Sequence, residues 1–485
     1  MKLDYEQRKA IGLDFIVDEM IADSPYGANK IKALKFHNEH GREALEAVFF
    51  NIGKILGYLK SNEEHLDIIR LLLKKLKNIS GALKKCGFTY LHEVELYEIK
   101  NFLLIQLNLL DEFNKMNGEI HLKNLELIDM EAALDIVDPD KKRISSFSIS
   151  ETKPVLWPEL WEIRQEKLRV ESIIRNEKDK TRLEKLNIER AKIVAKEEQQ
   201  ETRIKIDMSN KLRPYIDVFE KNIDSIGELD LLIQKALLAR KYNANAPVIS
   251  TKAELSFVGM FNPMVENILA ARGKDFTPLS IDLPAGATIL TGANMGGKSV
   301  AIKTIVLNVC LARMGFYVFA ESAEIPLFDG VYLVSEDLQS VSNGLSTFGA
   351  EIIKLNELIN KSKSEFLLIA LDEIARSTNP SEGAIIAKAV SSYLNGISSI
   401  SILSTHYDNV AEEGMNHYQV AGLRDLDFTA IDATGTEALA ELMDYSLVRV
   451  SENTKPPQDA LNICKILSLE PEILDRIESL YHGKM

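Results

Sequence analysis

The pattern of apolar and polar positions changes about halfway along the chain. Before residue 242, apolar residues recur at spacings of three and four, for example in 66–83 and 94–110. Such spacing places apolar side chains on one face of a helix. Glycine is sparse in this half. The pattern therefore predicts an all-α region over residues 1–242.

A dense charge run lies within this helical half. Residues 159–213 contain neither Gly nor Pro and are rich in Glu, Lys and Arg. This composition predicts long exposed helices, and a turn near Asn176 to Lys180 would make them a helical hairpin. The simplest interpretation of the charges is a solvated helix face.

Strand-like segments appear after Tyr242 to Thr251, where Asn, Ala and Pro interrupt the helical period. Residues 279–299 read as strands that lead into a glycine loop, and 364–374 and 398–408 read as buried strands with polar ends. Because helical segments separate them, we predict an α/β domain over 252–450 with a largely parallel sheet. A small helical segment over 456–485 would follow it.

Composition and net charge indicate the cellular environment of the protein. The 485 residues are 46% hydrophobic and 27% charged, which is typical of a soluble multidomain chain. Cys86, Cys310 and Cys464 are far apart and include no CxxC, so a reducing compartment is expected. The sequence has no signal-peptide core and no apolar run of membrane-spanning length, which favours the cytoplasm and no membrane partner. The net charge of −14 argues against nonspecific polyanion binding, although a local basic patch can still bind DNA.

The glycine loop is the first motif with a defined chemistry. Residues 292–299 read GANMGGKS, of the form GxxxxGKS, between a strand-like and a helix-like segment. Such a loop wraps backbone N–H groups around phosphates, and the following helix directs its positive end at them. Lys298 would reach the β and γ phosphates, and the Ser299 hydroxyl would ligate Mg²⁺. The predicted ATP-binding residues are Gly292, Asn294, Met295, Gly296, Gly297, Lys298, Ser299 and Val300.

Two further motifs lie at the ends of predicted strands. Asp372 and Glu373 end an apolar run, where paired carboxylates suit phosphoryl transfer. Asp372 would hold Mg²⁺, and Glu373 would polarise the attacking water. His406 ends the next strand, where a parallel sheet exposes residues that face a ligand, and would sense the γ-phosphate. Lys298, Glu373 and His406 are thus the predicted catalytic residues.

Together these motifs resemble the ATPase domain of the MutS family, a branch of the ABC-type ATPases. The likeness runs from Phe261 to Asp408, and the family's loop, GPNMGGKS, differs from 292–299 at one position. Residues 319–333 and 344–352 also resemble family segments. By this resemblance, Ser346 and Thr347 contact the γ-phosphate of a partner subunit. The resemblance therefore implies a dimer with two composite ATP sites, built from identical chains or from a related subunit.

The helical half resembles the core and lever helices of that family more weakly, and the tail at 460–477 resembles its C-terminal helix-turn-helix. The family's mismatch-reading and connector domains have no counterpart in this sequence. The predicted turn near 176–180 leaves no room for a clamp domain between the lever helices. Residues 376–383, RSTNPSEG, replace the glycine-threonine run that repair proteins usually have there.

Three functions remain open from the sequence. The first is a dimeric MutS-type ATPase that acts on DNA, as its relatives do. The second is an ATP-dependent reactivating factor for a protein client, like that of the adenosylcobalamin enzyme lysine 5,6-aminomutase. The third is a nucleotide-dependent switch without significant turnover. A small basic cluster consists of Lys74, Lys75, Lys77, Lys84 and Lys85. Its simplest interpretation is a solvated helix face, and the alternative is a contact with DNA.

Overall fold

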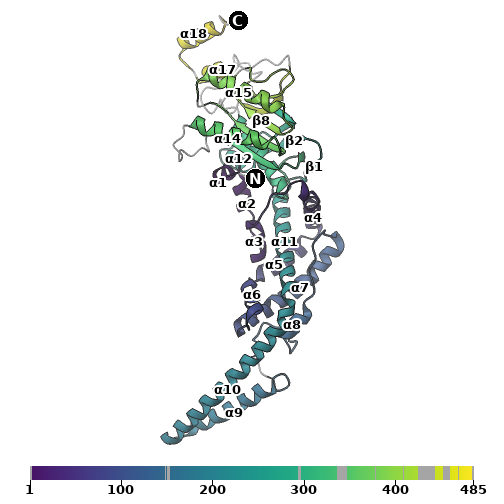
Figure 1. The fold of residues 1–485 in the computed structure, drawn as a ribbon, viewed down its shortest axis with the longest axis vertical. Coiled ribbons are helices and arrows are strands. Elements are labelled where there is room, and N and C mark those ends of the chain that lie inside the picture. The colour runs from purple at the N-terminus through teal and green to yellow at the C-terminus, as the bar shows by residue number, and fades with distance from the viewer. Residues whose placement is uncertain are drawn as a thin grey trace. The chain divides into compact units, whose positions relative to one another are not determined.

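The chain forms two compact units in the computed structural model (Figure 1). The structure describes residues 3–147, 149, 153–292, 297–335, 347–376, 378–407, 409–423, 443–451, 459–467 and 469–482. The helical unit comprises Ile21–Ala33 and Lys54–Gln234. The sheet unit comprises Met1–Met20, Leu34–Gly53 and Lys235–Met485.

The helical unit is built from amphipathic helices. In α5 the buried residues Leu66, Ile69 and Leu73 recur at spacings of three and four, as predicted for one apolar face. Helix α7 buries a longer stripe of the same kind, and α11 contributes residues to both units. The helices are α3 (Pro25–Lys32), α5 (Glu63–Lys75), α6 (Ser80–Phe88), α7 (Glu93–Ile120), α8 (Glu131–Val137), α9 (Pro158–Asn176), α10 (Lys180–Leu212) and α11 (Ile216–Lys241).

Helices α9 and α10 lie side by side and form the predicted hairpin, which is therefore confirmed (Figure 1). Only residues 177–179 connect them, so no clamp domain lies between them. Asp179 caps α10 by accepting a hydrogen bond from the Thr181 N–H. Ion pairs cross the hairpin away from its turn: Arg164 with Glu197 and Glu201 (2.8 Å each), Lys167 with Glu197, and Arg190 with Glu171 (2.8 Å).

The sheet unit contains a six-stranded sheet of order β10-β9-β4-β8-β7-β6. Its strands pair in parallel except at the β10–β9 edge, which agrees with the predicted largely parallel sheet. The strands are β4 (Gly286–Thr291), β6 (Gly330–Ser335), β7 (Leu367–Asp372), β8 (Ile400–Ser404), β9 (Asn416–Gly422) and β10 (Asp444–Arg449).

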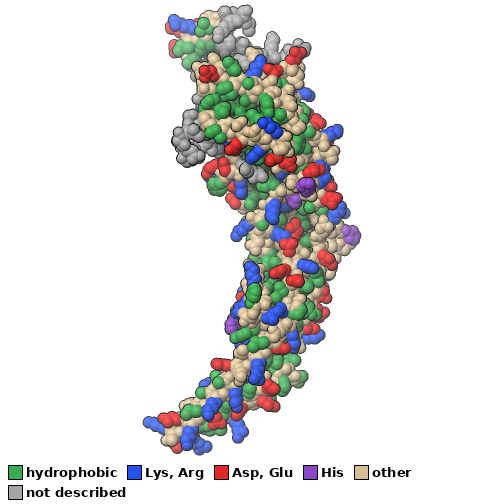
Figure 2. Space-filling view, viewed as in Figure 1, with side chains coloured by type: hydrophobic (Ala, Val, Ile, Leu, Met, Phe, Trp, Pro, Cys, Tyr) green, Lys and Arg blue, Asp and Glu red, His purple; other side chains and the backbone are tan. Residues whose placement is uncertain are grey.

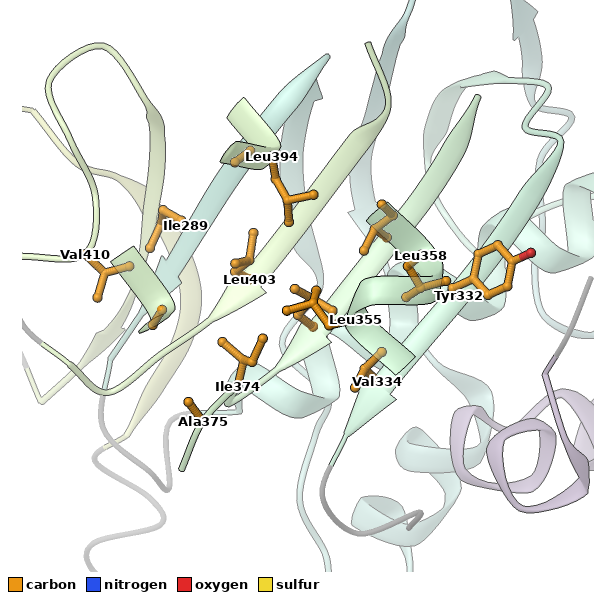
Figure 3. Close-up of a cluster of buried hydrophobic side chains, with 14 of the residues drawn as sticks. Ile289, Tyr332, Val334, Leu355, Leu358, Ile374, Ala375, Leu394, Leu403 and Val410 are labelled. Atoms are coloured by element: carbon orange, nitrogen blue, oxygen red, sulfur yellow. The ribbon is translucent and has the colours of Figure 1, made fainter. Parts of the chain in front are cut away.

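The central strands are buried because helices cover the sheet. Residues of β7 and β8 are buried along their whole length, which explains the apolar run of β7 and the mostly apolar sequence of β8. Leu355 and Leu358 of α14 (Thr347–Lys361) and Leu394 of α15 (Pro380–Asn395) share one core cluster with these strands (Figure 3). Helix α13 (Lys298–Arg313) packs against β6, β7 and β8.

A second sheet, of order β1-β5-β2-β3, and several helices complete this unit. The N-terminal segments also belong to it, and Gln7 of α1 donates a hydrogen bond to the Leu333 carbonyl (2.7 Å). The sequence did not predict this packing. The remaining elements are α1 (Tyr5–Ile11), α2 (Leu13–Asp18), α4 (Arg42–Ser61, shared between the units), β1 (Val248–Ser250), β2 (Glu254–Met260), α12 (Pro263–Ala270), β3 (Leu279–Pro284), β5 (Ser322–Pro326), α17 (Asp459–Ile466) and α18 (Pro471–His482).

Within the described ranges, no helix is both long enough and apolar enough to cross a membrane.

Candidate nucleotide-binding site

The glycine loop lies between β4 and α13. Gly292 and Gly297 have φ angles of +136° and +84°, a region in which side chains other than glycine are strained. Helix α13 begins at Lys298, so its N-terminal end faces the loop. Ser299 and Val300 are half-buried in its first turn. The predicted contacts of Asn294, Met295 and Gly296 fall outside the described residues.

The Lys298 amine is buried beside the loop. Its Nζ donates to the Gly292 carbonyl (2.7 Å) and lies 3.5 Å from Oε1 of Glu373. Burial lowers the pKa of Lys298, and the negative charge of Glu373 opposes that change. A buried cation with a backbone carbonyl as partner can exchange that partner for a phosphate oxygen.

Asp372 and Glu373 lie at the carboxyl end of β7, beside the end of β8. Asp372 is paired in register with Ser404, because the two strands are parallel neighbours. The Ser404 hydroxyl donates to Oδ1 of Asp372 (2.6 Å) and accepts from the Glu373 N–H (2.9 Å). Ser404 thus fixes both acids. Ser404 was not among the residues predicted from the sequence, although a polar residue at the tip of a buried strand is a usable signal.

A second cation contacts the Glu373 carboxylate. Nη1 of Arg376 lies 2.7 Å from Oε2 of Glu373, so Lys298 and Arg376 approach different oxygens. The Arg376 side chain is half exposed, which discounts this pair as a source of stability. The contact between Arg376 and Glu373 instead helps to orient the Glu373 carboxylate. Arg376 was not among the site residues predicted from the sequence.

His406 follows β8 and packs against the ring of Tyr407, with 4.2 Å between ring centroids. Partial burial lowers the pKa of His406; the charges of Lys298 and Arg376 act in the same direction, and Glu373 opposes them. The imidazole is therefore neutral at pH 7, able to donate one hydrogen bond and accept another. His406 is exposed, two residues beyond the end of β8.

Ser346 lies outside the described residues, and so does the side chain of Thr347, whose backbone begins α14. Their contact with the nucleotide of a partner subunit stays a prediction.

The side chains fit Mg²⁺ and ATP by the chemistry of their donors. The Ser299 hydroxyl and the Asp372 carboxylate are the oxygen ligands that Mg²⁺ prefers. The described residues hold no group of three or more His, Cys, Asp and Glu that could bind a metal ion alone. Mg²⁺ usually keeps several waters and binds through one or two protein groups plus phosphates. A site of this kind therefore suits Mg²⁺ that arrives with a nucleotide.

Comparison with known proteins relates part of the chain to a known family. Residues 288–449 match the family model described as MutS domain V. "Endonuclease MutS2" of Caldicellulosiruptor bescii is 34% identical over 223 residues, which cover 44% of this chain and 27% of that protein. "DNA mismatch repair protein MutS" of Petrotoga mobilis is 29% identical over 273 residues, which cover 56% of this chain and 32% of that protein. Residues 288–449 are thus similar to MutS domain V, and the similarity to these two proteins supports a relation to the MutS family.

The match to each of these MutS-family relatives spans about a third of the relative's length or less. The family-model match nevertheless contains the described site, because α13, β7, β8, β9 and β4 from Thr288 onward fall within residues 288–449. Domain V is the ATPase domain of this family. The relation is therefore informative about the nucleotide chemistry and less so about the helical unit.

Replacing Ser404 with Ala tests how this MutS-type site is held together. The change removes a donor to Asp372 and an acceptor for the Glu373 N–H, at a cost of about 1 kcal/mol for each hydrogen bond. We expect ATP hydrolysis to fall about tenfold or more, as measured by steady-state phosphate release. Ser401→Ala is the matched control, because Ser401 is buried on the same strand and its hydroxyl has no hydrogen-bond partner among the described residues. Equal rates for the two variants would contradict the prediction.

Proposed function

We propose that this chain is an ATP-hydrolysing, Mg²⁺-dependent motor of the MutS type that works as a dimer on DNA. One observation carries the proposal: Lys298, Asp372 and Glu373 meet at one edge of the parallel sheet, and the charges that act on His406 come from the same group. Ligands of α/β sheets bind beyond the carboxyl ends of the strands, where these residues lie.

The residues divide the chemistry among them. Lys298 moves from the Gly292 carbonyl to the phosphates, where its charge stabilises the transferred group. This movement also separates Lys298 from Glu373 and leaves the carboxylate to orient the attacking water. His406, neutral at pH 7, forms a hydrogen bond with the γ-phosphate. Bound Mg²⁺ would neutralise the phosphate charge, and Asp372, aligned by Ser404, would hold it with Ser299.

DNA is the partner that the comparisons favour. The relatives described above are named as an endonuclease and as a DNA mismatch repair protein. MutS-family proteins act as dimers and bind DNA. No named relative supports the alternative of a reactivating factor for an aminomutase. No described feature favours a protein client.

The hairpin turn supplies a surface for a polyanion. We call residues 172–192, which include the turn between α9 and α10, the hairpin tip. They hold seven Lys and Arg against four Asp and Glu, in a chain whose net charge is −14. Figure 2 shows Lys and Arg side chains gathered at this end of the hairpin. Five cations of the tip are exposed and form no ion pair within the described residues: Arg175, Lys178, Lys180, Lys185 and Lys192.

The basic cluster identified in the sequence is less suited to DNA. Lys74 lies 3.4 Å from Asp23, and Lys85 lies 2.7 Å from Glu95, so two of its five lysines have acidic partners. Lys75, Lys77 and Lys84 are exposed. They therefore serve as a control surface of similar charge.

Reversing charge at the hairpin tip tests DNA as the partner. In a triple variant with Arg175, Lys178 and Lys180 replaced by Glu, we expect DNA affinity to fall and its salt dependence to weaken. Each lost phosphate contact lowers the slope of log affinity against log salt by about 0.9. The measurement is a binding isotherm for duplex DNA at several salt concentrations. A matched triple variant, with Lys75, Lys77 and Lys84 replaced by Glu, should retain wild-type affinity.

ATPase assays with DNA test the function as a whole. The rate is measured for the protein alone and with homoduplex, mismatched and branched DNA at moderate salt. Stimulation by DNA, stronger for one of these structures, is the expected result. ATP hydrolysis that responds to none of them, together with no DNA binding, would remove DNA from the proposal and leave only the ATPase.

A further inference from the structure

The turn that follows the two acids has an unusual backbone. Glu373 and Ala375 have φ angles of +54° and +60°, in the left-handed region that glycine favours. Each such residue costs on the order of 1–3 kcal/mol and persists only where its surroundings hold it. The orientation of Glu373 therefore depends on contacts that fix this turn.

Two side chains from other segments hold both backbone polar groups of Ala375. The Ala375 N–H donates to the Glu351 carboxylate, whose oxygens lie 3.2 and 3.3 Å away. The Tyr407 hydroxyl donates to the Ala375 carbonyl (3.0 Å). Glu351 comes from the second turn of helix α14, and Tyr407 comes from the segment after β8. The backbone turn at Ala375 is therefore held by side chains from both of these segments.

These contacts lie in a closely packed region. Ala375 is completely buried, Glu351 is 7% exposed, and Ile374 and Ala375 join the core cluster at the end of β7 (Figure 3). A Cβ atom on Gly383 would lie 2.3 Å from the Tyr407 hydroxyl and 2.7 Å from the Ala375 carbonyl oxygen. Water therefore has little room to replace a lost partner, and an unpaired buried N–H destabilises the turn.

The tyrosine remains a hydrogen-bond donor under ordinary conditions. Burial raises the pKa of Tyr407, and the negative charges of Glu351 and Glu373 raise it further. Its hydroxyl therefore stays protonated well above neutral pH.

We propose that Glu351 is a positioning residue for ATP hydrolysis, which holds the left-handed turn at Ala375 and thereby aims the Glu373 carboxylate at the attacking water. Tyr407 supports the same turn from its carbonyl side. The inference rests on the proposed ATPase function. Glu351 does not touch the nucleotide in this account, so it governs turnover and not ATP affinity.

Three variants of the full chain test the proposal. Glu351→Leu removes the acceptor for the Ala375 N–H, Glu351→Gln keeps an oxygen acceptor, and Tyr407→Phe removes only the donor to the Ala375 carbonyl. We measure kcat, KM and the Kd for a fluorescent ATP analogue, with thermal melting as the check on folding. A misplacement of about 1 Å in a catalytic group can lower the rate about 100-fold.

We expect kcat to fall about 10- to 100-fold in Glu351→Leu and several-fold in Tyr407→Phe, with Kd within about threefold of wild type in both. Glu351→Gln should recover most of kcat. A purely structural role for Glu351 would lower stability without separating kcat from Kd.

Wild-type kcat in folded Glu351→Leu would overturn the proposal, and so would equal losses in the Leu and Gln variants. If Glu351→Leu does not fold, the other two variants test the proposal. Wild-type kcat in Tyr407→Phe, or a kcat in Glu351→Gln that does not recover, would then overturn it. Failure of the proposed ATPase looks different, because the wild-type protein itself would then hydrolyse no ATP.

Discussion

Replacing Glu373 with Gln is expected to lower the rate of ATP hydrolysis by about 10³-fold or more, while ATP stays bound. The amide cannot polarise the attacking water as a carboxylate does. Lys298, Gly292 and Gly297, which form the phosphate side of the site, are unchanged. The measurements are single-turnover hydrolysis and equilibrium binding of ATP, compared between the variant and the wild type.

A matched control separates catalysis from general loss of charge. Glu382 is an exposed acid in the first turn of α15, the helix that follows the catalytic turn, so Glu382→Gln should retain wild-type turnover. Comparing the wild-type rate with that of Glu373→Gln also tests the alternative that the protein is a switch without significant turnover. If wild-type protein hydrolyses ATP no faster than Glu373→Gln, this chain is a nucleotide-dependent switch and not a motor.

The parts of this fold that were predictable are those with local signals. The glycine loop is a contiguous motif, and the chain before and after it forms β4 and α13 as expected. The apolar run of β7 and the mostly apolar β8 predicted buried parallel strands, whose carboxyl ends lie together. Asp372 and His406 were therefore both expected at the ends of buried strands from the sequence alone. The hairpin turn at 177–179 lies where a turn was expected, near Asn176 to Lys180 within a charge-rich run that has neither Gly nor Pro.

The contacts that fix the site were not predictable, because they join residues far apart in sequence. Ser404 reaches back to Asp372, and Glu351 reaches forward to Ala375, with no local pattern that marks either pair. The left-handed backbone of Glu373 is equally hidden, since glutamate rarely adopts it. The N-terminal helices look like any other amphipathic helices. Their packing in the sheet unit depends on tertiary contacts such as that of Gln7 with Leu333.

These two groups of residues have different functions in the proposed mechanism. The motif residues supply charge and oxygen ligands, so their chemical type alone predicts their function. The supporting residues supply geometry, since Ser404 and Glu351 act through backbone N–H groups of Glu373 and Ala375. A catalytic carboxylate held only by a strained turn would sample several orientations. Holding the turn from β8 and α14 reduces that freedom before ATP binds.

Replacing Lys298 with Met is expected to weaken ATP binding about 100-fold or more, because charge-assisted contacts with phosphate are worth about 1.5–3 kcal/mol each. Met has nearly the same length and no charge, so it fits the space of a side chain that is only 2% exposed. The measurement is thermal melting with and without Mg²⁺ and ATP. Wild-type protein should melt at a higher temperature as ATP is added, since a ligand that binds only the folded state stabilises it.

The same variant should be as stable as the wild type, or more stable, when no nucleotide is present. Burial lowers the pKa of Lys298, which means that its charged form is disfavoured in the folded protein. Removing this buried charge offsets the loss of the contacts with Gly292 and Glu373. Lys303→Met, further along α13, controls for the change of residue type and should keep the full response to ATP. A Lys298→Met protein that still melts higher with ATP would show that this amine is not needed to bind the phosphates.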